Sequence, residues 1–216
     1  MSLYKKGFNM VSNHFKKKEN HKTKMFKKGD LDLYEGFKNS YASRKDQEKF
    51  GADAGYIFDA ELSNDNQQVY FNPDKKKLLY SVSGTHNLSD IGTDIQLMRG
   101  KLKDTKRYKQ SQATLDKAKE KYQPESVTGY GTSLGGQIVN NLSDIDRKIT
   151  LNKATPIFGK TSKGEHIRSQ GDIVSIFGAN AKHAQTLSGG GDLFDPKTWL
   201  NAHSSDSIKG KGFRFG

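Results

Sequence analysis

The sequence predicts an α/β protein, in which a mainly parallel sheet is flanked by helices in a compact arrangement. Short β-prone runs alternate with segments of helical pattern after residue 68, and a glycine-rich turn stands between one such run and the segment that follows it. The chain of 216 residues is 32% hydrophobic, enough for one core. Alternation of strands and helices favours parallel pairing, because a crossover helix returns the chain to the same end of the sheet.

The first thirty residues differ from the rest of the chain in charge. Residues 1–30 contain nine lysines and two acidic residues, a net charge of +7 out of +12 for the whole sequence. Their apolar residues follow neither a helical nor a strand period. We therefore expect a flexible basic arm over 1–30, a folded domain over 31–208 and a flexible tail over 209–216.

The first elements predicted in the domain are a hairpin and two helices. Residues 68–71 and 77–83 are β-prone runs separated by Asn-Pro-Asp-Lys, a typical turn sequence. Residues 88–98 repeat apolar side chains at helical spacing, and residues 108–122 are rich in Lys, Ala and Gln before a proline. We expect both of these later segments to be surface helices.

A strand, a tight glycine turn and a helix are predicted next. Residues 126–130 form a short β-prone run, Gly-Thr-Ser-Leu-Gly-Gly at 131–136 forms the turn, and residues 137–142 are compatible with a helix. Further strands are expected at 148–151 and 173–177. This order completes the alternation that favours a parallel sheet.

The pattern Gly-x-Ser-x-Gly lies in this turn, centred on Ser133. Small residues two positions either side of a serine allow a strained turn that lifts its hydroxyl clear of the sheet, so Ser133 is the candidate nucleophile. The Leu134 N–H then stands at a helix start, where unsatisfied donors and the helix dipole stabilise an oxyanion. A plain glycine turn is the alternative interpretation. A phosphate-binding loop is disfavoured, because no lysine follows at the required spacing.

Composition excludes several kinds of site. The sequence has no cysteine, which rules out disulfides, thiolate metal ligands and a cysteine nucleophile. No run approaches the roughly 18 apolar residues of a membrane-spanning helix, and no apolar segment follows the first lysines. We therefore expect neither a transmembrane protein nor a signal peptide. No His or Asp spacing indicates a metal, and no metal or organic cofactor is expected.

Four segments, taken in order, carry a resemblance to a known family. They are Ser-Gly-Thr at 83–85 followed by Asp94, the run Val-Thr-Gly-Tyr-Gly-Thr-Ser-Leu-Gly-Gly at 127–136, a strand at 149–154 that leads to Thr-Pro, and Gly-Asp-Ile-Val at 171–174. The chain resembles the class 3 lipases, also called fungal-type triacylglycerol lipases, of the α/β-hydrolase fold. Each of the four segments has a counterpart in that family.

The resemblance implies a site as well as a fold. It gives Asp172 the role of the aspartate that orients the catalytic base. Because Ser, Asp and His follow one another along the chain in this fold, the base is a later histidine: His203 is preferred and His183 is the alternative. The resemblance also assigns Thr85 to the oxyanion hole together with Leu134, with Asp94 positioning the Thr85 hydroxyl.

The reaction implied is hydrolysis of a carboxylic ester, in a triglyceride, a phospholipid or a small soluble ester, through an acyl-enzyme on Ser133. Two positions depart from the family pattern: Thr132 stands where the family has His, and Ser83 where it has Arg. These changes keep the nucleophile but alter its surroundings. A catalytically inactive α/β-hydrolase with a binding or structural role, for instance in a virion, is therefore an alternative function.

The basic arm indicates an anionic partner. Its lysines alternate with Phe8, Phe15 and Phe26, a combination that favours peripheral contact with an anionic membrane surface. The same lysines would neutralise the phosphates of nucleic acid, so a nucleic-acid-binding protein is a further alternative, although the sequence has no zinc-finger, RNP or helix-turn-helix signature. The chain also resembles compact, lysine-rich proteins of large DNA viruses, and a cytoplasmic or virion-associated location is expected.

Overall fold

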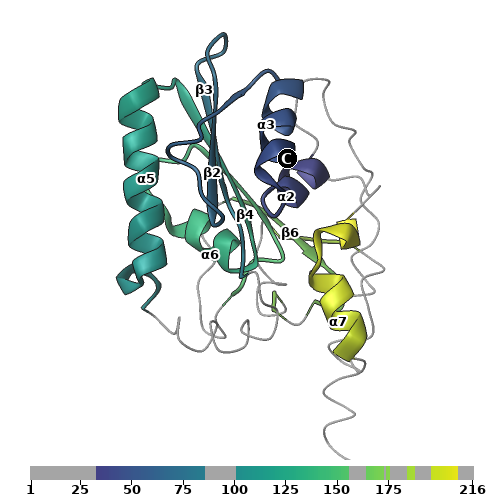
Figure 1. Ribbon diagram of the computed structural model, residues 1–216. Helices are drawn as coiled ribbons and strands as arrows, with labels where there is room; N and C mark the ends of the chain where they lie inside the picture. Colours follow the sequence, from purple (N-terminus) through teal and green to yellow (C-terminus); the bar gives the residue numbers. More distant parts are fainter. Residues whose placement is uncertain are drawn as a thin grey trace, which may run out of the picture. The chain divides into compact units, whose positions relative to one another are not determined.

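A mixed sheet of seven strands forms the centre of the described part of the chain (Figure 1). The structure is a computed structural model, and it describes residues 33–85, 101–155, 164–172, 174–175, 184–187 and 196–208. The strands lie in sequence order: β1 (Ile57–Phe58), β2 (Gln67–Asn72), β3 (Lys77–Val82), β4 (Ser126–Thr132), β5 (Arg147–Leu151), β6 (Glu165–Ser169) and β7 (Ala184–Leu187). The first two pairings are antiparallel, and every pairing from β3 to β7 is parallel. The protein is thus of the α/β class, with a mostly parallel sheet.

The predicted hairpin is present as the pair β2 and β3. At its turn the Lys75 N–H donates to the Asn72 side chain at 2.8 Å, and Lys76 has a φ of +45°. Asn is suited to this turn because its side chain bonds to backbone a few residues on. Nearly all residues of both strands are buried. Burial on both faces is typical of a strand that helices cover on both sides.

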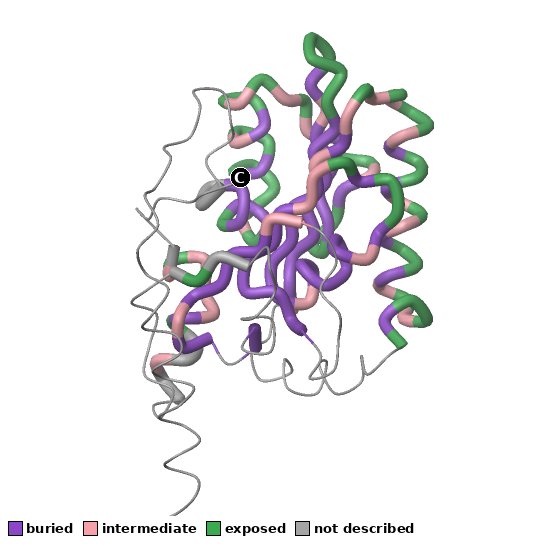
Figure 2. The backbone as a smooth tube through the Cα atoms, turned by 180° about the vertical axis from the view of Figure 1, so that it is seen from behind, coloured by how far each residue is buried: buried purple, intermediate pink, exposed green. Residues whose placement is uncertain are grey.

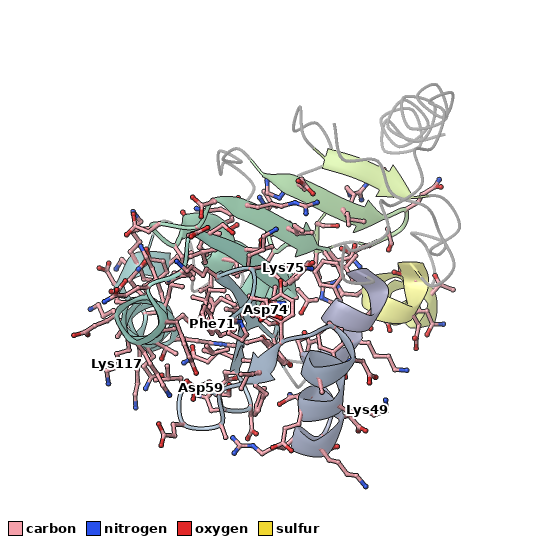
Figure 3. The ribbon with its side chains drawn as sticks, turned by 90° about the horizontal axis from the view of Figure 1, so that it is seen from above. Lys49, Asp59, Phe71, Asp74, Lys75 and Lys117 are labelled. Carbon is pink, nitrogen blue, oxygen red and sulfur yellow. The ribbon has the colours of Figure 1, made fainter. Side chains whose placement is uncertain are left out.

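Helices lie on both faces of the sheet (Figure 3). One face carries α5 (Lys106–Tyr122) and α6 (Ser133–Asn141), and the other carries α2 (Leu33–Asn39), α3 (Arg44–Asp53) and α7 (Pro196–His203). The strands are buried, whereas exposed residues gather on the outer sides of the helices (Figure 2). Fully buried side chains of the core include Val69, Leu78, Tyr80, Val82, Leu115, Ala118, Ile138 and Val139.

Helix α5 shows how local sequence sets an element. The Thr105 hydroxyl caps its start by accepting the Tyr108 N–H at 3.2 Å. Gln123 ends it in a left-handed conformation with a φ of +44°, directly before Pro124, which cannot continue a helix. The helix predicted at 108–122 is therefore confirmed and begins two residues earlier, at Lys106.

The structure corrects two predicted elements. Helix α6 begins at Ser133 rather than at residue 137, so two of the glycines lie in its first turn. The strand predicted at 173–177 is wrong at its described positions, because Val174 and Ser175 form a bend. Their N–H groups donate to the carboxylate of Asp172, which removes them from strand pairing. The strand that precedes this bend is β6.

Other predictions concern parts of the chain that are not described. The helix expected over 88–98, the arm over 1–30 and the tail over 209–216 lie wholly or mainly outside the described residues. The sequence patterns also missed α2 and α3. The buried positions of α3 are Gln47 and Gly51, so no apolar stripe marks this helix. Within the described ranges, no helix is both long and apolar enough to cross a membrane.

Candidate active site

Ser133 stands at the junction of β4 and α6. Its φ is +50°, a left-handed conformation that few non-glycine residues adopt, and its side chain is buried. A Cβ at Gly131 would lie 2.5 Å from the Gly135 carbonyl oxygen, and a Cβ at Gly135 would lie 2.1 Å from the Val82 carbonyl oxygen. Backbone therefore occupies the space that side chains would need at both positions. The structure thus explains both glycines of the Gly-x-Ser-x-Gly pattern.

The end of β3 lies directly against this turn. A Cβ at Gly84 would lie 2.8 Å from the Cβ of Ser133. Thr85, which follows Gly84, and Leu134, which follows Ser133, are both partly buried. Gly84 and Ser133 are thus in contact, and each is followed in the chain by one of the two residues predicted to donate an N–H group to an oxyanion. Asp94, the predicted support of Thr85, lies outside the described residues.

Asp172 is fully buried and follows β6 after a short turn. Its Oδ1 accepts the Val174 N–H at 3.2 Å, and its Oδ2 accepts the Ser175 N–H at 3.1 Å. The Ser175 hydroxyl also donates to Oδ2. Hydrogen bonds to its own following turn hold the carboxylate in one orientation.

His203 is the last residue of α7, and its ring contacts this carboxylate. Its Nδ1 lies 2.8 Å from Asp172 Oδ1, although 31 positions separate the two residues in sequence. An ionised carboxylate only accepts hydrogen bonds, so Nδ1 carries the proton, and Nε2 of the neutral ring is left as an acceptor. The structure thus brings the predicted aspartate and the preferred histidine together. His183, the alternative, lies outside the described residues.

Asn152 links the histidine to the sheet. Its Nδ2 donates to the carbonyl oxygens of Ala202 at 2.9 Å and His203 at 3.1 Å, and its Oδ1 accepts the Ser169 N–H at 2.7 Å. The two carbonyls lie at the C-terminal end of α7, where helices leave such groups without helical partners. Sequence reasoning missed Asn152. Its only local signal is a polar residue after a β-run, at a φ of +46° that asparagine tolerates well.

The segment after β5 contacts both parts of the site. Two residues beyond Asn152, the Ala154 N–H donates to the Ser133 carbonyl at 3.0 Å. Strands β4, β5 and β6 are parallel neighbours, so Ser133, this segment and Asp172 all follow the carboxyl ends of adjacent strands. That edge is where ligands bind in open α/β sheets.

Lys153 lies between the two contacts of this segment and is only 4% exposed. A Cβ at Gly136 would lie 3.3 Å from the Lys153 Cβ, so the side chain starts against the first turns of α6. Its Nζ has no hydrogen-bond partner among the residues that the structure describes. Burial lowers the pKa of Lys153 to about 7, because a desolvated ammonium is unfavourable. The charge beside α6 therefore changes near neutral pH.

The chain is similar to a solved lipase structure, but no protein-family model matches it and no curated protein matches its sequence. Among solved structures, the crystal structure of the Lip2 lipase from Yarrowia lipolytica is similar, with a TM-score of 0.49 and 14% sequence identity. The likeness covers 84% of this chain and 85% of the lipase chain. At this identity and score it assigns no activity, so the function has to be argued from the site.

Proposed function

We propose that this chain is a serine hydrolase of the α/β-hydrolase fold, similar to the class 3 lipases, and that it cleaves carboxylic esters of lipids. One observation carries the proposal: a serine in a left-handed strand-to-helix turn shares a sheet edge with a His203 ring that is hydrogen-bonded to the buried Asp172. A turn of this kind presents a hydroxyl as nucleophile, and an imidazole oriented by a carboxylate acts as its base. A nucleophile and an oriented base are the two groups that acyl transfer to a serine requires.

In the proposed mechanism, Ser133 Oγ attacks the ester carbonyl carbon while His203 Nε2 takes the hydroxyl proton. The carbonyl becomes a tetrahedral oxyanion, whose collapse expels the alcohol with the proton returned by His203. A water molecule, deprotonated by the same nitrogen, then attacks the carbonyl carbon of the acyl-enzyme and forms a second tetrahedral oxyanion. Its collapse breaks the bond to Ser133 Oγ, which takes the proton back from His203 as the carboxylic acid leaves. Asp172 keeps Nδ1 protonated and stabilises the imidazolium that forms in each half of the cycle.

Two N–H groups are proposed to stabilise the oxyanion. The Leu134 N–H stands in the first turn of α6, where the helix dipole adds favourable potential. The Thr85 N–H follows Gly84, which contacts the nucleophile turn. Loss of one such donor slows acyl transfer by about 10²–10³-fold. The role of Asp94 in positioning the Thr85 hydroxyl is carried over from the family resemblance.

The proposed substrate class also comes from the family resemblance. Residues 86–93 correspond to the lid of class 3 lipases, and their large apolar residues are Leu88 and Ile91. So small an apolar surface favours weak interfacial activation on neutral oil droplets. A panel of esters of increasing acyl length, with and without phospholipid vesicles, distinguishes a triglyceride, a phospholipid and a soluble ester as the preferred substrate.

For residues 1–30 we propose contact with an anionic membrane surface. Each lysine near such a surface contributes on the order of 1 kcal/mol within about one Debye length. Deleting the arm should lower hydrolysis of esters in anionic vesicles at low salt and leave hydrolysis of a soluble ester unchanged. Equal loss on both substrates would contradict this role, and vesicle binding abolished by competing duplex DNA would favour nucleic acid as the partner.

The decisive test of the enzyme proposal is covalent labelling with a fluorophosphonate. The wild type should react and hydrolyse esters, and Ser133→Ala should do neither while keeping the wild-type circular dichroism spectrum. Ser143→Ala, at an exposed serine, is the matched control and should keep both properties. A folded wild type that is neither labelled nor active would contradict the proposal and favour an inactive hydrolase with a binding role.

A further inference from the structure

Arg107 of α5 holds the backbone that precedes the proposed oxyanion donor Thr85. Its Nη2 donates to the carbonyl oxygen of Ser83 at 2.5 Å and to that of Gly84 at 3.0 Å. The Gly84 carbonyl and the Thr85 N–H belong to one planar peptide group, in which the two bonds point in opposite directions. Arg107 therefore directs the Thr85 N–H away from its own guanidinium. A cation bonded to the carbonyl also polarises the peptide, which makes its N–H a stronger donor.

Two hydroxyl groups hold the preceding peptide from the other side. The Gly84 N–H donates to the Tyr41 hydroxyl at 2.7 Å and to Thr132 Oγ1 at 3.1 Å. These two oxygens share a further hydrogen bond of 2.6 Å. Burial of the phenol group raises the pKa of Tyr41, so this hydroxyl stays protonated at neutral and mildly alkaline pH. Because Thr132 directly precedes Ser133, the network ties the end of β3 to the nucleophile turn.

The start of this segment is held as well. The Ser83 N–H donates to the Asn66 carbonyl at 3.0 Å, and the Ser83 hydroxyl donates to the Asp65 carbonyl at 3.0 Å. Every backbone polar group from the Ser83 N–H to the Gly84 carbonyl thus has a partner in the structure. These partners come from several separate parts of the chain. A backbone fixed in this way needs little reorganisation when charge develops nearby, which is the condition for efficient oxyanion stabilisation.

We propose that Arg107, together with Tyr41 and Thr132, positions and polarises the Thr85 N–H as an oxyanion donor. The proposal rests on the ester-hydrolase function proposed above. These three are positioning residues, since they act through the peptide groups of residues 83–85 and not on the substrate. Of these three residues Arg107 has the largest effect, because its guanidinium bonds to the carbonyl of the peptide group that contains the donor N–H.

The test compares Arg107→Met, Arg107→Lys and Tyr41→Phe with Lys109→Gln, which removes a positive charge from an exposed position of the same helix. Active sites are first titrated with the fluorophosphonate, so that each rate refers to competent enzyme. Arg107→Met should lower kcat by about 10–100-fold with KM changed less than about twofold, since a misplaced donor costs less than the roughly 10²–10³-fold of a deleted one. Tyr41→Phe should lower kcat by about 3–10-fold, and Lys109→Gln should match the wild type.

A second measurement separates positioning from a merely structural role. A trifluoromethyl ketone forms a tetrahedral adduct with the serine and carries the oxyanion. Its inhibition constant should rise by the same factor as kcat/KM falls in each variant, because both report binding of the same charge. Arg107→Lys and Tyr41→Phe carry the test if Arg107→Met does not fold.

The outcomes distinguish the two proposals. Wild-type kcat in the titrated variants, or unchanged affinity for the ketone, overturns the positioning role and leaves the enzyme proposal standing. A loss that appears only as fewer titratable sites also overturns it, because it shows a purely structural role. A wild type that the fluorophosphonate does not label overturns both proposals.

Discussion

The turn that carries Ser133 and the pair formed by Asp172 and His203 lie at the same sheet edge, but different forces hold them. The Ser133 turn is held by backbone packed against backbone, with no room for a Cβ at Gly131 or Gly135. The Asp172–His203 pair is held by side-chain hydrogen bonds between segments distant in sequence. Close backbone packing requires glycines at fixed positions, so it leaves a short motif in the sequence. A network of side-chain hydrogen bonds leaves no such motif, because its members are far apart in the chain.

The largest effect is expected from Asp172→Asn, which tests the hydrogen-bonded pair of Asp172 and His203. The amide cannot reproduce a carboxylate that accepts from both the His203 ring and Ser175, so the imidazole loses its favoured tautomer. We expect kcat for ester hydrolysis to fall by about 10⁴-fold, the size of effect seen when a triad aspartate is replaced in this way. A loss below about tenfold in steady-state assays, with the fold intact, would contradict the proposed triad.

Gly135→Ala tests the close backbone packing at the Ser133 turn. The new Cβ would lie 2.1 Å from the Val82 oxygen and 2.4 Å from the Ser83 oxygen, so α6 and the end of β3 would have to separate. We expect the free energy of unfolding in urea to fall by about 3 kcal/mol or more.

The matched control for this variant is Gly36→Ala. The nearest neighbour of that added Cβ is the Phe50 ring at 3.9 Å, within a helix. This substitution should raise stability by about 0.5–1 kcal/mol, because alanine is the better helix former. Equal effects of the two substitutions would show that the close contact at Gly135 does not constrain the turn.

Asn152→Asp tests the link between helix α7 and the sheet. It removes the two N–H donors of the Asn152 amide and keeps the oxygen that accepts the Ser169 N–H. The carbonyls of Ala202 and His203 would then face a carboxylate instead of an amide N–H. We expect the free energy of unfolding to fall by about 2–3 kcal/mol. We expect kcat to fall with it, because helix α7, which carries the proposed base His203, loses these two hydrogen bonds. Unchanged stability and kcat would mean that other contacts hold α7 in place.

Lys153→Met should give the smallest effect. The effect is a change in how the free energy of unfolding depends on pH. The pKa of Lys153 is about 7 in the folded protein and 10.5 as an ordinary value, so between these values the unfolded chain binds more protons. Wild-type stability gains from this lysine as pH rises through that window, by at most about 1.4 kcal/mol per pH unit.

The matching measurement compares urea unfolding of the two proteins at several pH values. Lys153→Met should be the more stable protein at pH 7, and its advantage should shrink by about 1–2 kcal/mol towards pH 9. An advantage that stays constant across this window would contradict the lowered pKa of Lys153.

Elements with strong local signals were predicted from the sequence. The β2–β3 hairpin has its turn sequence, α5 has a segment rich in Lys, Ala and Gln with a following proline, and the Ser133 turn has its glycines. Where the buried side is polar, as at Gln47 in α3, hydrophobic pattern carried no signal. The strand predicted at 173–177 is wrong at Val174 and Ser175, because their N–H groups donate to the Asp172 carboxylate instead of to a neighbouring strand.

The sequence by itself determined the Ser133 turn, because five consecutive residues contain both the proposed nucleophile and the glycines that let backbone approach it. It could only rank His203 above His183 as the partner of Asp172. The tertiary structure decided that His203 meets Asp172, that Asn152 anchors α7, and that Arg107 and Tyr41 reach the Gly84 backbone. Each of these hydrogen bonds has one partner in a segment that follows a parallel strand at this sheet edge and the other on a helix or on the turn after one. The partners are therefore set by how the helices pack on the sheet and not by any pattern of neighbouring residues.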